Sequence, residues 1–221
     1  MRTIAIVSQK GGAGKTTLAI NLAVEAARTE VTLILDTDPQ ATASRWGEWR
    51  GGRDPEVIDC GAPSLLSGKL AKAAELGAYL AIIDTPPHAD AMARQAARLA
   101  DLVLIPCRPR AFDLAAIEAT AELVNSNRKP AFVVFNAGPP RAQVIYAEAA
   151  SLVGGGFGLA IAPVLLPERA DFHHSAAVGV AAAERDGHGK AANEIRALWA
   201  WAREQVGLSA GRRVGAKEPA A

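Results

Sequence analysis

The sequence predicts an α/β fold in which a doubly wound, mostly parallel sheet is flanked by helices. Strand-like and helix-like stretches alternate along the 221 residues, as in consecutive βαβ units. The strand-like runs, such as Val31–Leu35 and Tyr79–Ile83, are apolar throughout, which is expected for strands that helices cover on both faces. Polar clusters follow several of these runs, and in such sheets ligands bind beyond the carboxyl ends of the strands.

Each expected strand is a short apolar run, and each expected helix carries apolar residues at helical spacing. We expect strands at 3–7, 31–35, 57–60, 79–83, 102–105, 131–135 and 159–166. We expect helices at 16–28, 41–50, 64–76, 89–99, 113–124, 143–152 and 189–206. Ser64 is the expected N-cap of the third helix, and Gly154-Gly155-Gly156 is expected to break the sixth. Pro163 lacks a backbone donor, so the last strand is expected at a sheet edge.

Length and composition favour one domain over residues 1–206, followed by a disordered tail at 207–221 that is small and polar. Hydrophobic residues make up 50% of the chain and aromatic residues 5%, so the core should be mainly aliphatic. The net charge of +1 gives no bulk attraction to nucleic acid, and any DNA contact must come from a local patch. We expect a cytoplasmic protein, because no signal peptide or membrane-length apolar run is recognisable. Cys60 and Cys107 lie far apart and are expected to be buried fillers.

The chain is organised around the glycine-rich stretch Ser8–Thr17, which joins the first strand to the first helix. Small residues there let backbone N–H groups point at an anion, and the helix N-terminus adds positive dipole. Lys15 would meet the β- and γ-phosphates, and the Thr16 hydroxyl would bind Mg²⁺. The residues expected at the phosphates are Gly11, Gly12, Ala13, Gly14, Lys15, Thr16 and Thr17. The alternative is an ordinary turn with two solvated lysines.

Carboxylates end two neighbouring strands of the predicted sheet. Asp84 follows the Leu80–Ile83 run and is the expected Mg²⁺ ligand, held directly or through water. Asp36 and Asp38 follow the second strand, where a carboxylate can orient the attacking water or support the metal shell. The alternatives are a loop-capping role for Asp84 and a pair of turn aspartates at 36 and 38.

Two motifs resemble those of the ParA/MinD family of ATPases, which have a deviant Walker P-loop. Lys10-Gly11-Gly12-Ala13-Gly14-Lys15-Thr16-Thr17 is similar to K-G-G-x-G-K-T-T, and Asp36-Thr37-Asp38-Pro39-Gln40 to the family's second signature. The stretch 36–46 looks most like the small plasmid-partition ParA proteins, which lack an N-terminal helix-turn-helix domain. The resemblance covers about residues 3–206 and implies ATP and Mg²⁺ as cofactors.

The resemblance also implies roles for individual residues. Lys10 would reach the phosphates of a partner subunit in a nucleotide-sandwich dimer, and Asp38 would serve hydrolysis. Asp36 is then expected in the metal shell or in loop positioning. Asn136, at the end of the sixth expected strand, would contact adenine, and Pro167 would flank the same base.

The implied function is that of a partition ATPase. ATP would drive formation of a homodimer that binds DNA non-specifically and associates with the nucleoid. A ParB-like or other adaptor would stimulate hydrolysis and so position a plasmid, chromosome or protein cluster. Late basic residues are the candidate DNA contacts: Arg141, Arg169, Lys190, Arg196 and Arg203, with Arg212, Arg213 and Lys217 in the tail.

Two alternatives remain within the same fold. A MinD-like membrane-cycling ATPase would need a C-terminal amphipathic helix, and the segment after Val206 has no apolar stripe, so no membrane partner is expected. A small-molecule ATP-dependent enzyme is the other alternative. An iron–sulfur reductase is disfavoured because Asp84–His88 contains no cysteine. His173-His174 has no ligand partner at metal spacing and is expected to be a surface pair.

Overall fold

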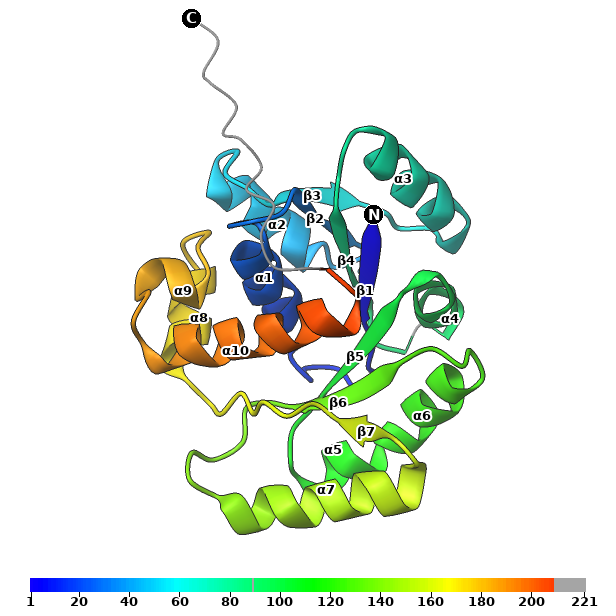
Figure 1. Cartoon of the computed structure of the whole chain (residues 1–221), viewed down its shortest axis with the longest axis vertical. Helices are drawn as coiled ribbons and strands as arrows, with labels where there is room; N and C mark the ends of the chain where they lie inside the picture. Colours follow the sequence, from blue (N-terminus) through cyan, green and yellow to red (C-terminus); the bar gives the residue numbers. More distant parts are fainter. Residues whose placement is uncertain (89, 209–221) are drawn as a thin grey trace, which may run out of the picture.

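The computed structural model describes residues 1–88 and 90–208, and its core is a seven-stranded sheet in the order β3-β2-β4-β1-β5-β6-β7. Every neighbouring pair of strands is parallel, so the predicted doubly wound parallel sheet is confirmed (Figure 1). The strands are β1 Arg2–Ile6, β2 Thr32–Asp36, β3 Glu56–Asp59, β4 Leu80–Asp84, β5 Leu102–Cys107, β6 Ala131–Phe135 and β7 Ala160–Ile161.

Helices cover both faces of the sheet (Figure 1). One apolar layer joins the sheet to α3, α4, α5, α6 and α7, and the other joins it to α1, α2, α8, α9 and α10. The first group is α3 Pro63–Glu75, α4 Asp90–Leu99, α5 Ala111–Ala115, α6 Ile117–Asn125 and α7 Gln143–Phe157. The second group is α1 Lys15–Ala26, α2 Thr42–Arg50, α8 Ala170–Ala176, α9 Ala182–Arg185 and α10 Lys190–Gln205.

The continuous apolar runs arise from this double coverage. In β2, Leu33 and Leu35 pack into the layer with α3 and α4, whereas Ile34 packs into the layer with α1. Successive side chains of a strand point to opposite faces, so a strand buried on both faces must be apolar at every position.

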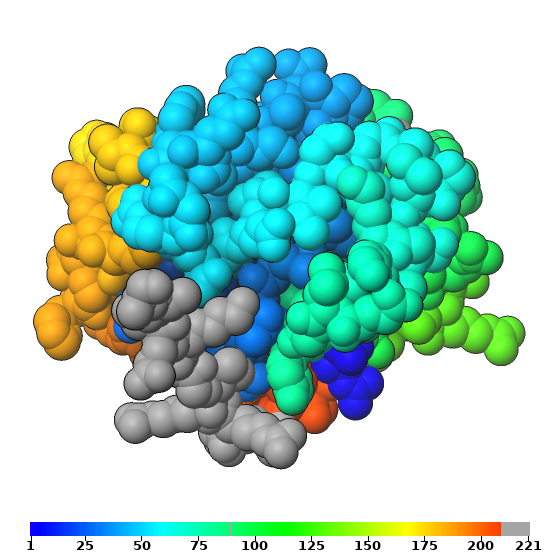
Figure 2. All heavy atoms as spheres, turned by 90° about the horizontal axis from the view of Figure 1, so that it is seen from above, coloured from blue at the N-terminus to red at the C-terminus, as the bar shows by residue number. Residues whose placement is uncertain are grey.

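The C-terminal end of α2 is fastened to α9 and to the segment before it, and the two regions adjoin on the surface (Figure 2). Arg50 is buried at 3% exposure, and its guanidinium donates to both carboxylate oxygens of Glu184 at 2.8 and 2.9 Å. It also donates to the Gly179 carbonyl at 3.1 Å and lies 4.6 Å from the centre of the Trp46 ring. Paired and hydrogen-bonded in this way, the buried charge is compensated.

The structure corrects the expected end of the helix that begins at Gln143. Its three glycines do not break it, and α7 continues through Gly154-Gly155-Gly156 to Phe157. It ends at Gly158, whose φ of 63° is the left-handed conformation that glycine adopts readily. Packing of Tyr146, Ala149 and Val153 against the sheet outweighs the low helix propensity of the glycines.

The last strand is shorter than predicted, and its edge position is confirmed. Residues 160 and 161 pair with β6, the chain then leaves the ladder, and a single parallel bridge re-forms between Leu166 and Asn136. Pro163 lies in the gap and has no N–H to donate.

The helices differ from expectation in three further respects. The N-cap of α3 is Ala62 with Pro63 first in the helix, so Ser64 is not the cap; proline suits the first turn because its missing N–H would have no helical partner. The helix expected at 113–124 is two helices, α5 and α6, which meet at Ala116. The short helices α8 and α9 were not predicted.

Other expectations concern burial. Cys60 and Cys107 are both free and buried, as expected. Trp199 is buried, and the partly buried Trp201 packs edge-on against Phe132 with ring centres 4.9 Å apart. Among the described residues, no helix is long and apolar enough to cross a membrane. Most of the expected tail, residues 209–221, lies outside the described part of the chain.

We expect Gly154→Ala to raise the midpoint of thermal unfolding by roughly 2 °C. Gly154 is inside α7, and a Cβ added there would meet nothing within 4 Å. Alanine is favoured over glycine in a helix interior by about 1 kcal/mol. Thermal denaturation followed by circular dichroism measures the shift.

The matched control is Gly179→Ala, which should lower the midpoint. A Cβ there would lie 2.5 Å from the Trp49 backbone carbon, and its φ is +67°. A loss of stability in the Gly154 variant would contradict the helical conformation of the glycine run.

Candidate nucleotide-binding site

The parallel register brings the carboxyl ends of β1, β4 and β2 to the same end of the sheet. Ile6 is level with Asp84, and Asp84 is level with Asp36. Two threonines fix these ends: the Thr85 hydroxyl donates to the Ile6 carbonyl at 2.8 Å, and the Thr37 hydroxyl donates to the Asp84 carbonyl at 2.7 Å. The carboxylates predicted from separate motifs therefore belong to one site.

The glycine-rich loop turns sharply into α1. Gly12 and Gly14 have φ values of 69° and 92°, which glycine adopts without steric cost. A Cβ on Gly14 would lie 2.4 Å from Nδ2 of Asn136, and that amide donates to the Ala13 carbonyl at 2.6 Å. Gly14 is thus required by its backbone conformation and by the close approach of β6.

Lys15 is the first residue of α1 and is buried. Its ammonium donates to the Lys10 carbonyl at 3.1 Å, so the side chain folds back along the loop. Burial lowers the pKa of Lys15, and the nearby carboxylates of Asp84 and Asp38 oppose that shift. A cation with so little solvent around it is stabilised by a bound anion.

Asp84 is fully buried beneath the loop, and neither of its carboxylate oxygens accepts a hydrogen bond from the described residues. The pKa of Asp84 is raised to about 7, chiefly by burial; the negative charges of Asp36 and Asp38 also raise it, whereas Thr16 and Lys15 partly oppose the shift. Thr16 thus faces the carboxylate without completing a hydrogen bond of ordinary geometry. Buried polar atoms are almost always partnered, so the ionised form of this carboxylate would be stabilised by a bound cation.

This donor set fits Mg²⁺. Among residues 1–88 and 90–208 no cluster of three or more His, Cys, Asp or Glu side chains could hold a metal by itself. Mg²⁺ is usually held by one or two protein oxygens together with waters and substrate phosphates. Asp84 and the Thr16 hydroxyl supply protein oxygens of that kind beside the phosphate loop.

Asp36 uses its carboxylate within its own loop. One oxygen accepts from the Ser44 backbone and hydroxyl at 2.7 and 2.8 Å, and the other accepts from the Asp38 backbone at 3.2 Å. These contacts favour loop positioning over the metal shell. Asp38 is partly exposed, and its Oδ1 accepts from the Gln40 backbone at 2.9 Å.

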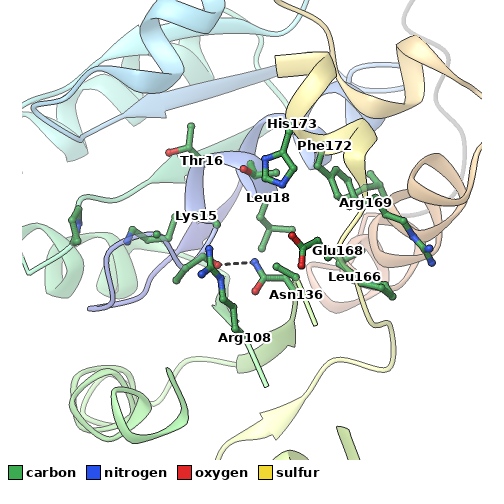
Figure 3. A pocket seen from close by; sticks show the side chains of 18 of the residues that line it. Lys15, Thr16, Leu18, Arg108, Asn136, Leu166, Glu168, Arg169, Phe172 and His173 are labelled. Atoms are coloured by element: carbon green, nitrogen blue, oxygen red, sulfur yellow. Dashed lines mark hydrogen bonds between the residues drawn. The ribbon is translucent and has the colours of Figure 1, made fainter. Parts of the chain in front are cut away.

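A cavity of about 330 Å³ opens over the loop, and Figure 3 shows its lining side chains. The predicted site residues that line it are Gly12, Ala13, Gly14, Lys15, Thr16, Thr17, Asp38, Asn136 and Pro167. Four others lie outside the lining: Lys10, Gly11, Asp36 and Asp84. Asn136 follows β6 directly, and Pro167 follows Leu166, which forms a parallel bridge with Asn136, so both belong to the same wall of the cavity.

Several lining residues belong to none of the sequence motifs. Arg108 follows the end of β5 directly, and Phe172 and Ile195 form apolar wall from α8 and α10. The strand-end rule could have identified Arg108, but the strand was expected to end at Ile105, three residues earlier. His173 borders the cavity from α8, and both histidines of the expected surface pair are exposed.

Several predicted DNA-contact residues are engaged in ion pairs. Arg169 pairs with Glu194 at 2.6 Å, Arg196 with Glu25 at 3.5 Å, and Arg203 with Glu30 at 3.1 Å. Arg141 and Lys190 are exposed and have no ion-pair partner among the described residues. The tail residues Arg212, Arg213 and Lys217 lie outside the described part.

A parallel sheet with a glycine-rich loop, a lysine at the start of the following helix and an acidic strand end defines a P-loop nucleotide-binding domain. The family model described as the CobQ/CobB/MinD/ParA nucleotide binding domain matches residues 4–181. The chain therefore belongs to this ParA/MinD family.

The similar proteins are named either for carboxysome distribution or as ParA. A maintenance of carboxysome distribution protein A from Halothiobacillus neapolitanus is 28% identical over 89% of this chain and 94% of its own length. One of the same name from Gloeobacter kilaueensis is 37% identical over 54% of this chain, and the match spans 55% of that relative. A protein named ParA from Rhizobium radiobacter is 36% identical over 51% of each chain.

Solved structures support the fold. The MinC:MinD cell division protein complex of Aquifex aeolicus gives a TM-score of 0.74 at 17% identity, over 92% of this chain and 96% of that one. An ATP complex of a Cyanothece McdA variant gives 0.71 at 19% identity, over 95% and 97%. MinD with Mg-ADP from Pyrococcus horikoshii gives 0.71 at 16% identity, over 94% and 98%.

We expect Asp84→Asn to stabilise the metal-free protein at pH 8. Because the pKa of Asp84 is about 7 in the folded state and about 4 in an unfolded chain, the folded state holds a proton that the unfolded state has lost between these values. Folding stability contributed by this group is thus full below pH 4 and falls as pH rises to 7. Asparagine does not titrate, so the folding stability of the variant lacks this decrease between pH 4 and pH 7.

The gain at pH 8 has an upper limit of roughly 4 kcal/mol, at about 1.4 kcal/mol per pKa unit, and it should vanish below pH 4. Urea unfolding at several pH values without Mg²⁺ measures it. The control is Asp59→Asn, which removes a carboxylate of the same kind from an exposed position at the end of β3. Equal pH profiles for the Asp84 variant and the wild type would contradict the raised pKa.

Proposed function

We propose that this protein is an ATPase that uses ATP binding and hydrolysis to position or partition a cargo. The observation that carries the proposal is the orphaned Asp84 carboxylate beneath a loop that presents Lys15 and Thr16 to the cavity. A phosphate-bound Mg²⁺ would satisfy the carboxylate, and the phosphates would satisfy Lys15 and the N-terminus of α1.

The remaining roles follow from where the side chains lie. Asp38 lies at the cavity on the loop that Asp36 holds, within reach of a role in orienting the attacking water. The proposed contacts of the base are the Pro167 segment and Oδ1 of Asn136, which has no hydrogen-bond partner among residues 1–88 and 90–208. A bound Mg²⁺ would neutralise charge on the transferring phosphoryl group.

Lys10 supports the idea of a shared site. It precedes the cradle, does not line the cavity of its own subunit, and its ammonium has no hydrogen bond or ion pair among the described residues. A cation placed outside its own site is suited to compensating transition-state charge in a second subunit, as an arginine finger does. Because Lys10 would act on the nucleotide of the other subunit, hydrolysis would depend on an ATP-driven homodimer.

The names of the relatives support a positioning role, since two refer to carboxysome distribution and a third is ParA. In the proposed cycle, the protein is an ATP-dependent dimer that binds non-specific DNA and is released when an adaptor stimulates hydrolysis. Nucleotide and adaptor would bias two states of one dimer.

We expect Lys10→Ala to retain ADP affinity and to lose at least tenfold of its ATP hydrolysis rate, because charge compensation in trans contributes to the transition state and not to binding in the monomer. Phosphate release measures the rate, and labelled ADP measures the affinity. Lys15→Ala is the matched comparison and should lose nucleotide binding itself. If Lys10→Ala hydrolysed ATP at the wild-type rate, the in-trans role would be excluded.

We expect ATP, and not ADP, to cause binding to random-sequence DNA at low salt. The net charge is near zero, so a weak patch would gain strength only when a dimer doubles it, and added salt should weaken binding steeply. A gel-shift measures this binding. Asp38→Ala is expected to hold ATP without turnover, so its complex with DNA should persist. Absence of ATP-dependent binding at low salt would favour the membrane-cycling or small-molecule alternatives.

A further inference from the structure

We infer that Arg108 is a second phosphate-binding side chain of the cavity, acting beside Lys15 on the nucleotide of its own subunit. This inference rests on the proposed function, since it takes a nucleoside di- or triphosphate as the occupant of the cavity. The family motifs in this sequence do not include this residue.

The backbone of Arg108 is fixed at the end of a central strand. Its carbonyl accepts from the Arg110 N–H at 2.8 Å and from the Cys107 thiol at 3.2 Å, and Asn136 N–H donates to the Cys107 carbonyl at 2.9 Å. Pro109 is buried against Gly138, where a Cβ would lie 2.6 Å from the proline ring. The arginine therefore starts from a rigid position next to Asn136.

The guanidinium reaches the phosphate loop. Nη2 lies 4.0 Å from the position that a Cβ on Gly12 would occupy, and Arg108 lines the same cavity as Lys15 and Thr16. Figure 3 shows its side chain extending from the end of β5 towards the loop, beside Asn136. This places a positive charge on the β5 side of the loop, opposite the β4 side that holds Asp84.

Arg108 has no counter-charge among the described residues. It forms no ion pair there, and its Nε is buried without a hydrogen-bond partner. By contrast, Arg169, which also lines the cavity, donates to both oxygens of Glu194 at 2.6 and 3.3 Å. Of these two arginines, only Arg108 is available for a ligand.

A phosphate group suits the Arg108 guanidinium better than other ligands do. Guanidinium groups bind phosphate oxygens in a planar, two-pronged geometry, and a half-buried cation beside a phosphate cradle gains most from an anion. Arg110, two residues further on, is exposed and lies outside the cavity lining. Of these two arginines in one loop, Arg108 therefore lies at the cavity and Arg110 at the surface.

The experiment compares Arg108→Gln with Arg110→Gln, which removes the same charge from the same loop. Fluorescent ADP and ATP are titrated with Mg²⁺ into each full-length variant, with Lys15→Ala as a reference and thermal unfolding as a check of folding. We expect Arg108→Gln to bind ADP roughly tenfold more weakly, the factor that about 1.4 kcal/mol represents. Arg110→Gln should match the wild type, and Arg108→Lys should recover part of the affinity.

The ADP titration decides the inference because it reports on the subunit's own site without an ATP-driven dimer. Wild-type ADP affinity in a folded Arg108→Gln protein would overturn it, as would a loss limited to ATP or to DNA binding, since those results place the arginine at a partner. If Lys15→Ala alone weakened ADP, the inference would fail while nucleotide binding stood. If the wild-type protein bound neither nucleotide, the proposed function would fail as well.

Discussion

The buried Asp84 carboxylate beneath a cationic loop is the constraint on which the site depends. Its position is set by the pairing of β4 with both β1 and β2, which also brings the phosphate loop and Asp36 to the same edge. A charged group with unpartnered oxygens in the interior is costly unless a cation joins it. The fold tolerates this carboxylate because Lys15 and the start of α1 lie close by, and a bound metal would complete the compensation.

The positive groups around the loop differ in what they can reach. Lys15 is buried and turned along its own loop, Arg108 lines the cavity from β5, and Lys10 stands outside that lining. Charge near the phosphates is therefore divided between groups fixed within one subunit and a group free to meet another. This division gives a physical basis for separating nucleotide binding from hydrolysis.

Asp38 lies in a loop that leads into α2, and the segment formed by this loop and α2 is held at both ends. Asp36 grips its start through Ser44, and Arg50 fastens the far end of α2 to Glu184 and Gly179. Asp38 therefore lies between a strand end and the packed helix α2, next to Thr37, whose hydroxyl donates to the Asp84 carbonyl. The position of Asp38 is thus tied to that of the buried Asp84 carboxylate.

The sequence alone determined the fold class, the phosphate loop and the acidic strand ends, because each depends on local patterns: apolar runs, glycine at turns and aspartate after a strand. It also indicated the edge position of the last strand through Pro163. It failed where long-range packing overrides local preference. Helix α7 passes through three glycines because Tyr146, Ala149 and Val153 pack on the sheet, and α8 and α9 are too short to show a period.

Only the tertiary structure decided how the site residues divide their work. Strand register placed Asp36 where its oxygens accept from Ser44 and Asp38, and within the described part of the chain neither Asp84 oxygen accepts a hydrogen bond. Arg108 and Arg169 look alike in the sequence, but Glu194, on α10, neutralises only the second. Pairings between residues distant in the chain depend on three-dimensional proximity, which local sequence patterns do not encode.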